Sequence, residues 1–84
     1  MGTKHQRTLK AVFDEPVRSN IAWRDIESML NAAGAELTEG DGSRVRSALN
    51  GVRAVFHRPH PQKETDKETV RSMQRFLIEA GVTP

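Results

Sequence analysis

The chain has 84 residues, of which 36% are hydrophobic, and its 13 lysines and arginines outnumber its 11 acidic residues to give a formal net charge of +2. This length predicts one small domain over residues 1–84, because it leaves no room for a second core. The absence of cysteine excludes disulfides and thiolate metal ligands. No apolar run approaches the ~20 residues that a membrane helix needs, so we expect a cytoplasmic protein with no membrane association.

The charges are distributed unevenly along the chain. Residues 14–41 hold seven acids against two arginines, whereas residues 44–63 carry basic residues and histidines without any carboxylate. The histidines of this second stretch are His57 and His60, and its basic residues are Arg44, Arg46, Arg53, Arg58 and Lys63. A cationic field beside imidazoles, which titrate near neutral pH, is typical of a surface that handles RNA.

Two helices are predicted in the first part of the chain. The first covers Thr3–Phe13 and ends before Pro16, because proline cannot continue a helix. The second covers about Ile21–Ala33, with Asn20 as the expected N-cap and Gly34 in the left-handed position that closes it. Its apolar stripe has a 3.6-residue period and consists of Trp23, Ile26, Met29, Leu30 and Ala33. We expect this stripe, Trp23 included, to face the core.

The pattern then changes to strands. Ala35–Thr38 alternates between apolar and polar residues, which predicts a short strand, and the glycine-containing segment Glu39–Ser43 predicts a turn. Two further strands, Arg44–Leu49 and Val52–Arg58, are separated only by the dipeptide Asn50-Gly51. This dipeptide strongly indicates a hairpin, because both central residues of a type I′ turn need positive φ.

A two-residue turn fixes the register of the hairpin, so its two faces can be deduced. One face is mostly apolar and expected to be buried, with the opposed pairs Leu49–Val52, Ser47–Ala54 and Val45–Phe56. The other face carries the pairs Ala48–Arg53, Arg46–Val55 and Arg44–His57. Three arginines and one histidine are thus predicted to project from the same side of the hairpin. A solvated face without function is the alternative interpretation.

A last helix follows the hairpin. Pro59 and Pro61 predict an extended connection, and Thr65–Glu68 is a capping-box pattern that begins a helix ending at Gly81. The order α-α-β-β-β-α predicts an α+β fold, in which helices cover one face of a three-stranded antiparallel sheet and the other face is free to bind a ligand. Thr3–Phe13 is an N-terminal extension of this arrangement.

The candidate chemistry is cleavage of RNA by histidines. No nucleotide-binding or zinc motif is present, and two histidines fall short of the three ligands that a metal site needs. RNA carries its own nucleophile, the 2′-hydroxyl, so a protein need supply only proton transfer by histidine and phosphate binding by arginine. His57 and His60 are the candidate catalytic residues. Alternatively, His57 is an ordinary surface residue and His60 is structural, while His5 is expected to be a surface or packing residue of the first helix.

Several segments in this order resemble the HicA toxin family of bacterial toxin–antitoxin systems. They are the helix Trp23–Leu37, the pair Gly42-Ser43, the segment Arg58–Pro61 and the end of the last helix, Phe76–Gly81. The resemblance spans about Ile21 to Val82. It implies a small double-stranded-RNA-binding-like fold, cleavage of messenger RNA without a metal or another cofactor, and neutralisation by a HicB-like antitoxin.

One position departs from the family pattern. Members usually carry the catalytic histidine directly after the Gly-Ser pair or one residue beyond it, where this chain has Arg44 and Val45. His60-Pro61 matches a later histidine–proline pair of the family. Three functions therefore stay open: a toxin ribonuclease that uses His57 and His60, a non-catalytic RNA-binding module or degenerate relative, and a protein–protein module that docks an acidic partner. RNA contacts are expected from Arg44, Arg46, Arg53, Arg58 and Lys63.

Overall fold

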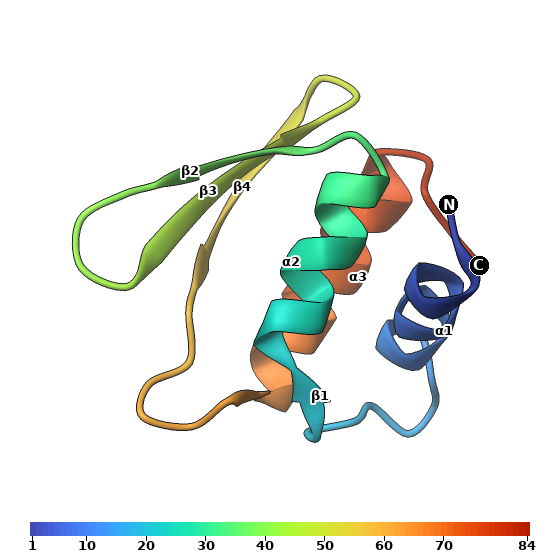
Figure 1. Cartoon of the computed structure of the whole chain (residues 1–84), viewed down its shortest axis with the longest axis horizontal. Helices are drawn as coiled ribbons and strands as arrows, with labels where there is room; N and C mark the ends of the chain where they lie inside the picture. The colour runs from blue at the N-terminus through green and yellow to red at the C-terminus, as the bar shows by residue number, and fades with distance from the viewer.

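The computed structural model, which describes all 84 residues, contains three helices, a three-stranded antiparallel sheet and a pair of two-residue strands (Figure 1). None of the helices has the length and apolarity needed to cross a bilayer. The predicted α+β class and the order of the main elements are confirmed. The elements in chain order are α1 (Thr3–Val12), β1 (Ile21–Ala22), α2 (Trp23–Ala32), β2 (Glu36–Glu39), β3 (Arg44–Leu49), β4 (Val52–His57), β5 (Glu64–Thr65) and α3 (Lys67–Glu79).

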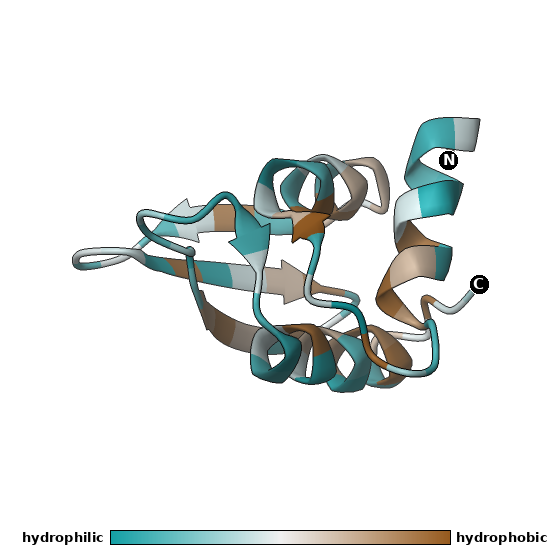
Figure 2. Ribbon diagram, turned by 90° about the horizontal axis from the view of Figure 1, so that it is seen from below, coloured by the Kyte–Doolittle hydropathy of each residue, from teal (hydrophilic) through white to brown (hydrophobic).

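The helices and the larger sheet form layers around one core. The sheet has the order β2-β3-β4, and α2 and α3 cover one of its faces (Figure 1). Helix α1 lies on the other side of α2 and α3 from the sheet (Figures 1 and 2). Seventeen buried apolar residues fill the core. Within it the ring of Trp23, only 4% exposed, lies 6.3 Å from that of Phe56, which meets Phe76 edge-on at 5.6 Å. The core position predicted for Trp23 is confirmed.

The hairpin β3–β4 has the register that the turn predicts. All six cross-strand pairs from Arg44–His57 to Leu49–Val52 are present. Asn50 and Gly51 adopt positive φ values of 50° and 81°, as a type I′ turn requires. The side-chain Nδ2 of Asn50 also donates a hydrogen bond of 2.8 Å to the carbonyl oxygen of Ala80. The tip of the hairpin is thereby fixed to the C-terminal end of α3.

The predicted start of the second helix is wrong. Ile21 and Ala22 form β1, which pairs with β5, and α2 begins at Trp23 with Ala22 as its N-cap residue instead of Asn20. The backbone N–H of Trp23 donates to the carbonyl oxygen of Lys63 at 2.9 Å. Backbone pairing with a segment more than 40 residues later in the chain therefore replaces the local side-chain cap.

The predicted capping box of the last helix is also wrong by one residue. Thr65 lies in β5 and is fully buried, and Asp66 is the N-cap. Its carboxylate accepts hydrogen bonds from the backbone N–H of Thr69 at 3.3 Å and from the Thr69 hydroxyl at 2.6 Å. Other predicted boundaries shift by one residue: the first helix ends at Val12, the first strand of the sheet is Glu36–Glu39, and the last is Val52–His57.

Arg58 connects the end of β4 to two other elements. Its Nη1 donates to Oε1 of Glu39 at 2.9 Å, and its Nη2 donates to Oε2 of Glu27 in α2 at 3.2 Å. The hydrogen bonds to Glu39 and then to Glu27 raise the pKa of the guanidinium above its ordinary value. The backbone N–H of Arg58 donates to the carbonyl oxygen of Ser43 at 2.7 Å. This residue therefore joins β4 to α2, to β2 and to the turn before β3.

Replacing Asp66 by alanine should lower the free energy of unfolding by about 1 kcal/mol at neutral pH, because an N-cap acceptor is lost. The hydrogen bond from Thr69 lowers the pKa of Asp66 below its ordinary value of 3.8. A lowered pKa in the folded state stabilises the protein above the unfolded pKa, and this stability is lost as the pH falls through the folded value. Urea unfolding should therefore show a difference between wild type and Asp66→Ala that shrinks in acid. Asp66→Asn, which keeps an uncharged cap, is the control, and a pH-independent difference would contradict the prediction.

Replacing Arg58 by alanine should lower the free energy of unfolding by about 1 kcal/mol at low salt, because two partly exposed ion pairs are lost. High salt should reduce this loss, since salt screens exposed charges. A double-mutant cycle of Arg58→Ala with Glu27→Gln, measured by urea unfolding, isolates the pair. Arg44→Ala removes an arginine outside any ion pair and serves as the control. Equal losses for the two arginines would show that the ion pairs do not stabilise the fold.

Candidate nucleic-acid interface

The face of the larger sheet that the helices leave uncovered, here called the outer face, carries side chains in cross-strand rows. The pairing of β2 with β3 and of β3 with β4 defines these rows. The first row is Glu36, Ala48 and Arg53, the second is Thr38, Arg46 and Val55, and the third contains Arg44 and His57. Their neighbours along β3 and β4, such as Val45 and Phe56, point the other way and are buried in the core.

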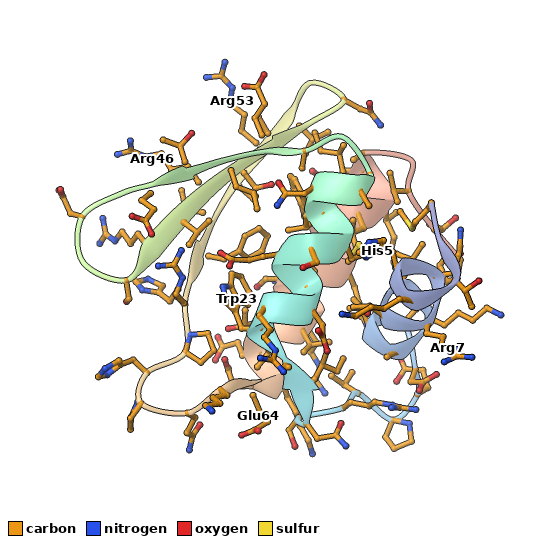
Figure 3. The ribbon with its side chains drawn as sticks, viewed as in Figure 1. His5, Arg7, Trp23, Arg46, Arg53 and Glu64 are labelled. Carbon is orange, nitrogen blue, oxygen red and sulfur yellow. The ribbon has the colours of Figure 1, made fainter.

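The cations of the outer face are not neutralised within the protein. Arg44, Arg46 and Arg53 are exposed, and none takes part in any of the four ion pairs. Figure 3 shows Arg46 and Arg53 pointing away from the helices. A guanidinium can bind two oxygens of a phosphate at once, and unpaired guanidinium groups on one face attract a polyanion. The face therefore has the electrostatics of a phosphate-binding surface.

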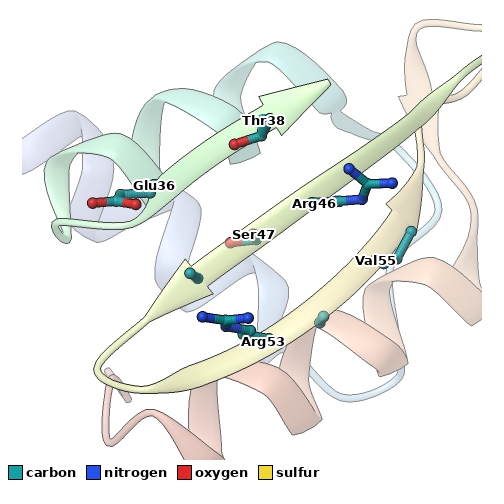
Figure 4. Close-up of a pocket in the computed structure, with 8 residues that line it drawn as sticks. Glu36, Thr38, Arg46, Ser47, Arg53 and Val55 are labelled. Carbon is teal, nitrogen blue, oxygen red and sulfur yellow. The ribbon is translucent and has the colours of Figure 1, made fainter. Parts of the chain in front are cut away.

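A shallow hollow of about 390 Å³ lies on the outer face. In the first row, Ala48 lies between Glu36 and Arg53. Its methyl group is shorter than the side chains on either side, so the surface is depressed at the centre of the row. Figure 4 shows the longer side chains of Arg46 and Arg53 beside this hollow, with Glu36 and Thr38 along β2. Its complete lining is Glu36, Thr38, Arg46, Ser47, Ala48, Arg53, Ala54 and Val55.

His57 lies at one end of the outer face. It is exposed and directly opposite Arg44, as the hairpin register predicts. It also borders a second hollow between β4 and the start of α3, where Asp66 and Glu68 contribute carboxylates. His57 is therefore placed between a free guanidinium on one side and carboxylates on the other.

His60 reaches the same end of the sheet by a different route. It is exposed in the connection between β4 and β5 and lines a small hollow together with Gly42, Ser43, Arg58 and Pro59. The hydrogen bond from the Arg58 backbone to Ser43 draws this connection toward the turn before β3. The structure thus places His60 beside the Gly-Ser pair, and His57 across from the residue that follows this pair.

The other candidate cations lie apart from the outer face. The charge of Arg58 is compensated by Glu27 and Glu39 on the helical side of the sheet. Lys63 is exposed, but it lines a separate hollow with Trp23 and Arg24 at the start of α2. Three of the five basic residues singled out in the sequence therefore share one surface, and the other two do not.

Two residues of the outer face went unrecognised in the sequence, namely Glu36 and Thr38. Their alternation with Leu37 indicates that they face away from the core, but only the pairing of β2 with β3 places them in rows with Arg53 and Arg46. His5 is half-buried in α1, away from the outer face, and its Nδ1 has no hydrogen-bond partner. No three histidine, cysteine or acidic side chains are grouped as a metal site would require.

Comparison with known proteins gives one match. The model of the family described as HicA toxin of bacterial toxin-antitoxin matches residues 23–82. No curated protein and no solved structure matches the chain. The matched segment starts at the first residue of α2, contains β2, β3, β4, β5 and α3, and leaves out residues 1–22, with α1 and β1, and the last two residues. Because the match covers most of the 84 residues, the chain belongs to the HicA family, the toxins of bacterial toxin–antitoxin systems.

Proposed function

We propose that this toxin is a ribonuclease that binds messenger RNA on the outer face of its sheet, cleaves it without a metal, and is neutralised by a HicB-like antitoxin. Membership of the HicA family supports the toxin and the antitoxin partner in general terms. The cross-strand pair of Arg44 and His57 on an open cationic face is the observation that supports cleavage. This pair sets a guanidinium, which can bind phosphate, beside an imidazole, which can transfer a proton.

The reaction that suits these residues is transfer of the phosphodiester to the 2′-oxygen of the same nucleotide. A neutral imidazole removes the proton of the 2′-hydroxyl, which attacks phosphorus, and an imidazolium protonates the leaving 5′-oxygen. The products are a 2′,3′-cyclic phosphate and a free 5′-hydroxyl. Arg44 and Arg46 would hold the non-bridging oxygens, where negative charge accumulates in the transition state.

His57 and His60 are proposed as the pair that moves these protons. They approach the same end of the sheet from β4 and from the connection that follows it, near Ser43 and Arg44. This arrangement offers a substitute for the histidine that family members usually carry after the Gly-Ser pair. Two carboxylates compensate the charge of Arg58, so we assign it the role of stabilising this end of the sheet. RNA binding is then assigned to the unpaired arginines of the outer face.

A non-catalytic RNA-binding protein is the second candidate. Arg44 and Val45 occupy the positions where the family usually has its catalytic histidine, and this favours a toxin relative that binds RNA without cutting it. RNA recognition by shape and backbone needs cations but no acid–base pair. An acidic antitoxin surface could also dock on the three unpaired arginines, in which case RNA and antitoxin would compete for the same face.

Replacing His57 or His60 by alanine should slow cleavage of a labelled transcript about 100-fold or more, because general acid–base catalysis is lost. Cleavage is measured on a gel, with detection of the 2′,3′-cyclic end. His5→Ala, which changes a histidine outside the interface, is the control. Wild-type rates in both variants would remove these histidines from the mechanism. Retarded but uncut RNA with the wild-type protein would favour the binding module.

Replacing Arg46 or Arg53 by alanine should weaken RNA binding and reduce the slope of log K against log salt by about one for each phosphate that the variant no longer binds. Fluorescence anisotropy of a labelled single-stranded RNA at several salt concentrations measures both quantities. Arg71→Ala, which removes an exposed arginine of α3, should leave the slope unchanged. If Arg71→Ala changed the slope as much as the two sheet variants, RNA would not bind specifically to the outer face.

A further inference from the structure

We propose that the hollow on the outer face is a base-binding subsite that selects guanine, and that the carboxylate of Glu36 makes the selection. This inference rests on the proposed function, since it requires RNA to lie on the outer face. It adds a substrate preference and assigns a role to a residue on β2. The arginines proposed to bind RNA, such as Arg46 and Arg53, would contact phosphate, and contacts to phosphate do not distinguish one base from another.

The geometry of the first row leaves room for a flat ring. Neighbouring strands lie about 4.8 Å apart, so the backbone positions of Glu36 and Arg53 are roughly 10 Å from each other with Ala48 between them. A methyl group is the only side chain between the carboxylate and the guanidinium. Figure 4 shows this gap, with Arg46 and Val55 of the next row along one side. A base can therefore lie over Ala48, with one edge toward Glu36.

Glu36 places a negative charge on a face whose other charged side chains are cationic. It is the only carboxylate among the residues that line the hollow, it is exposed, and it takes part in no ion pair. A free carboxylate on a phosphate-binding face repels the RNA backbone. It becomes favourable when it accepts hydrogen bonds from a base, because a carboxylate has two acceptor oxygens and no donor.

Guanine is the base whose hydrogen-bonding edge fits a carboxylate. Its Watson–Crick edge presents the N1–H and the exocyclic amino group side by side, so both carboxylate oxygens receive a hydrogen bond. Adenine and cytosine present an amino group next to an acceptor nitrogen, and uracil presents one N–H between two carbonyl oxygens. Each of these three bases would leave a carboxylate oxygen facing an acceptor.

The remaining side chains of the hollow complete a site for a nucleotide. The hollow has no aromatic residue in its lining, since Phe56 points into the core and His57 lies at the other end of the outer face. The guanidinium planes of Arg46 and Arg53 are the groups on which a base can stack, and each can also bind a neighbouring phosphate. Val55, which is 56% exposed, adds an apolar contact beside the hollow.

The subsite lies at a fixed distance from the proposed catalytic end. Ala48 is four positions beyond Arg44 along β3, which corresponds to about 13 Å of strand. The selected guanine and the phosphate near His57 would therefore belong to different nucleotides of the same strand. Cleavage should fall at a constant offset from guanine.

The test uses single-stranded RNA oligonucleotides that differ at one position, with guanosine, inosine, adenosine, cytidine or uridine in an otherwise guanine-free sequence. Inosine keeps the N1–H and lacks the amino group. The wild-type protein should bind the guanosine oligonucleotide roughly tenfold more tightly than those with adenosine, cytidine or uridine, with inosine between them. Glu36→Ala and Glu36→Gln should abolish the preference for guanosine, while Glu79→Gln, an acid on the exposed side of α3, should keep it. Circular dichroism confirms that the variants are folded.

Each result has a distinct meaning. Tight binding of all five oligonucleotides with equal affinity would overturn guanine selection and leave RNA binding by the outer face intact. A guanosine preference that persists in Glu36→Ala would overturn the role of Glu36. Binding of none of them would overturn the proposed function together with this inference. Gel mapping of cleavage sites on a longer transcript checks the constant offset independently.

Discussion

The reversal of the chain at Asn50 and Gly51 is the constraint on which the rest of the structure depends. Asn50 and Gly51, both with positive φ, form a two-residue turn that connects β3 directly to β4. A turn of this length and type fixes the register of the two strands. A slip of one residue would move the side chains of one strand to the other face, turning either Phe56 toward solvent or Arg46 toward α2 and α3. The hydrogen bond from Asn50 to Ala80 fixes the same turn to α3. One local backbone geometry therefore decides both what is buried and what can bind.

The arginines of this protein fall into two groups with different physical tasks. Arg58 is held by Glu27 and Glu39, and it connects β2, β4 and α2 at one end of the sheet. The arginines of the outer face have no acidic partner in the protein, and their charge is available to a ligand. Residues of one type, close together in the sequence, thus divide into a structural role and a proposed binding role according to the side of the sheet on which they lie.

The proposed catalysis relies on histidines at positions other than the one that family members usually use. Arg44 stands where the family usually has histidine, and His57 lies across from it on the neighbouring strand. His60 approaches the Gly-Ser pair because the backbone of Arg58 is hydrogen-bonded to Ser43. A catalytic group is defined by its place relative to the substrate, and residues from different segments can occupy that place.

The sequence by itself determined the helices with apolar stripes, the hairpin with its register, and the gathering of Arg44, Arg46, Arg53 and His57 on one face, because each follows from periodicity or turn geometry within a few residues. Only the tertiary structure decided the features that depend on distant segments. These are the pairing of β1 with β5 that replaces the Asn20 cap, the ion pairs of Arg58, the approach of His60 to Ser43, and the alignment of Glu36 with Arg53. Local patterns fix which way a side chain points, whereas its partners across the fold are fixed by how the whole chain packs.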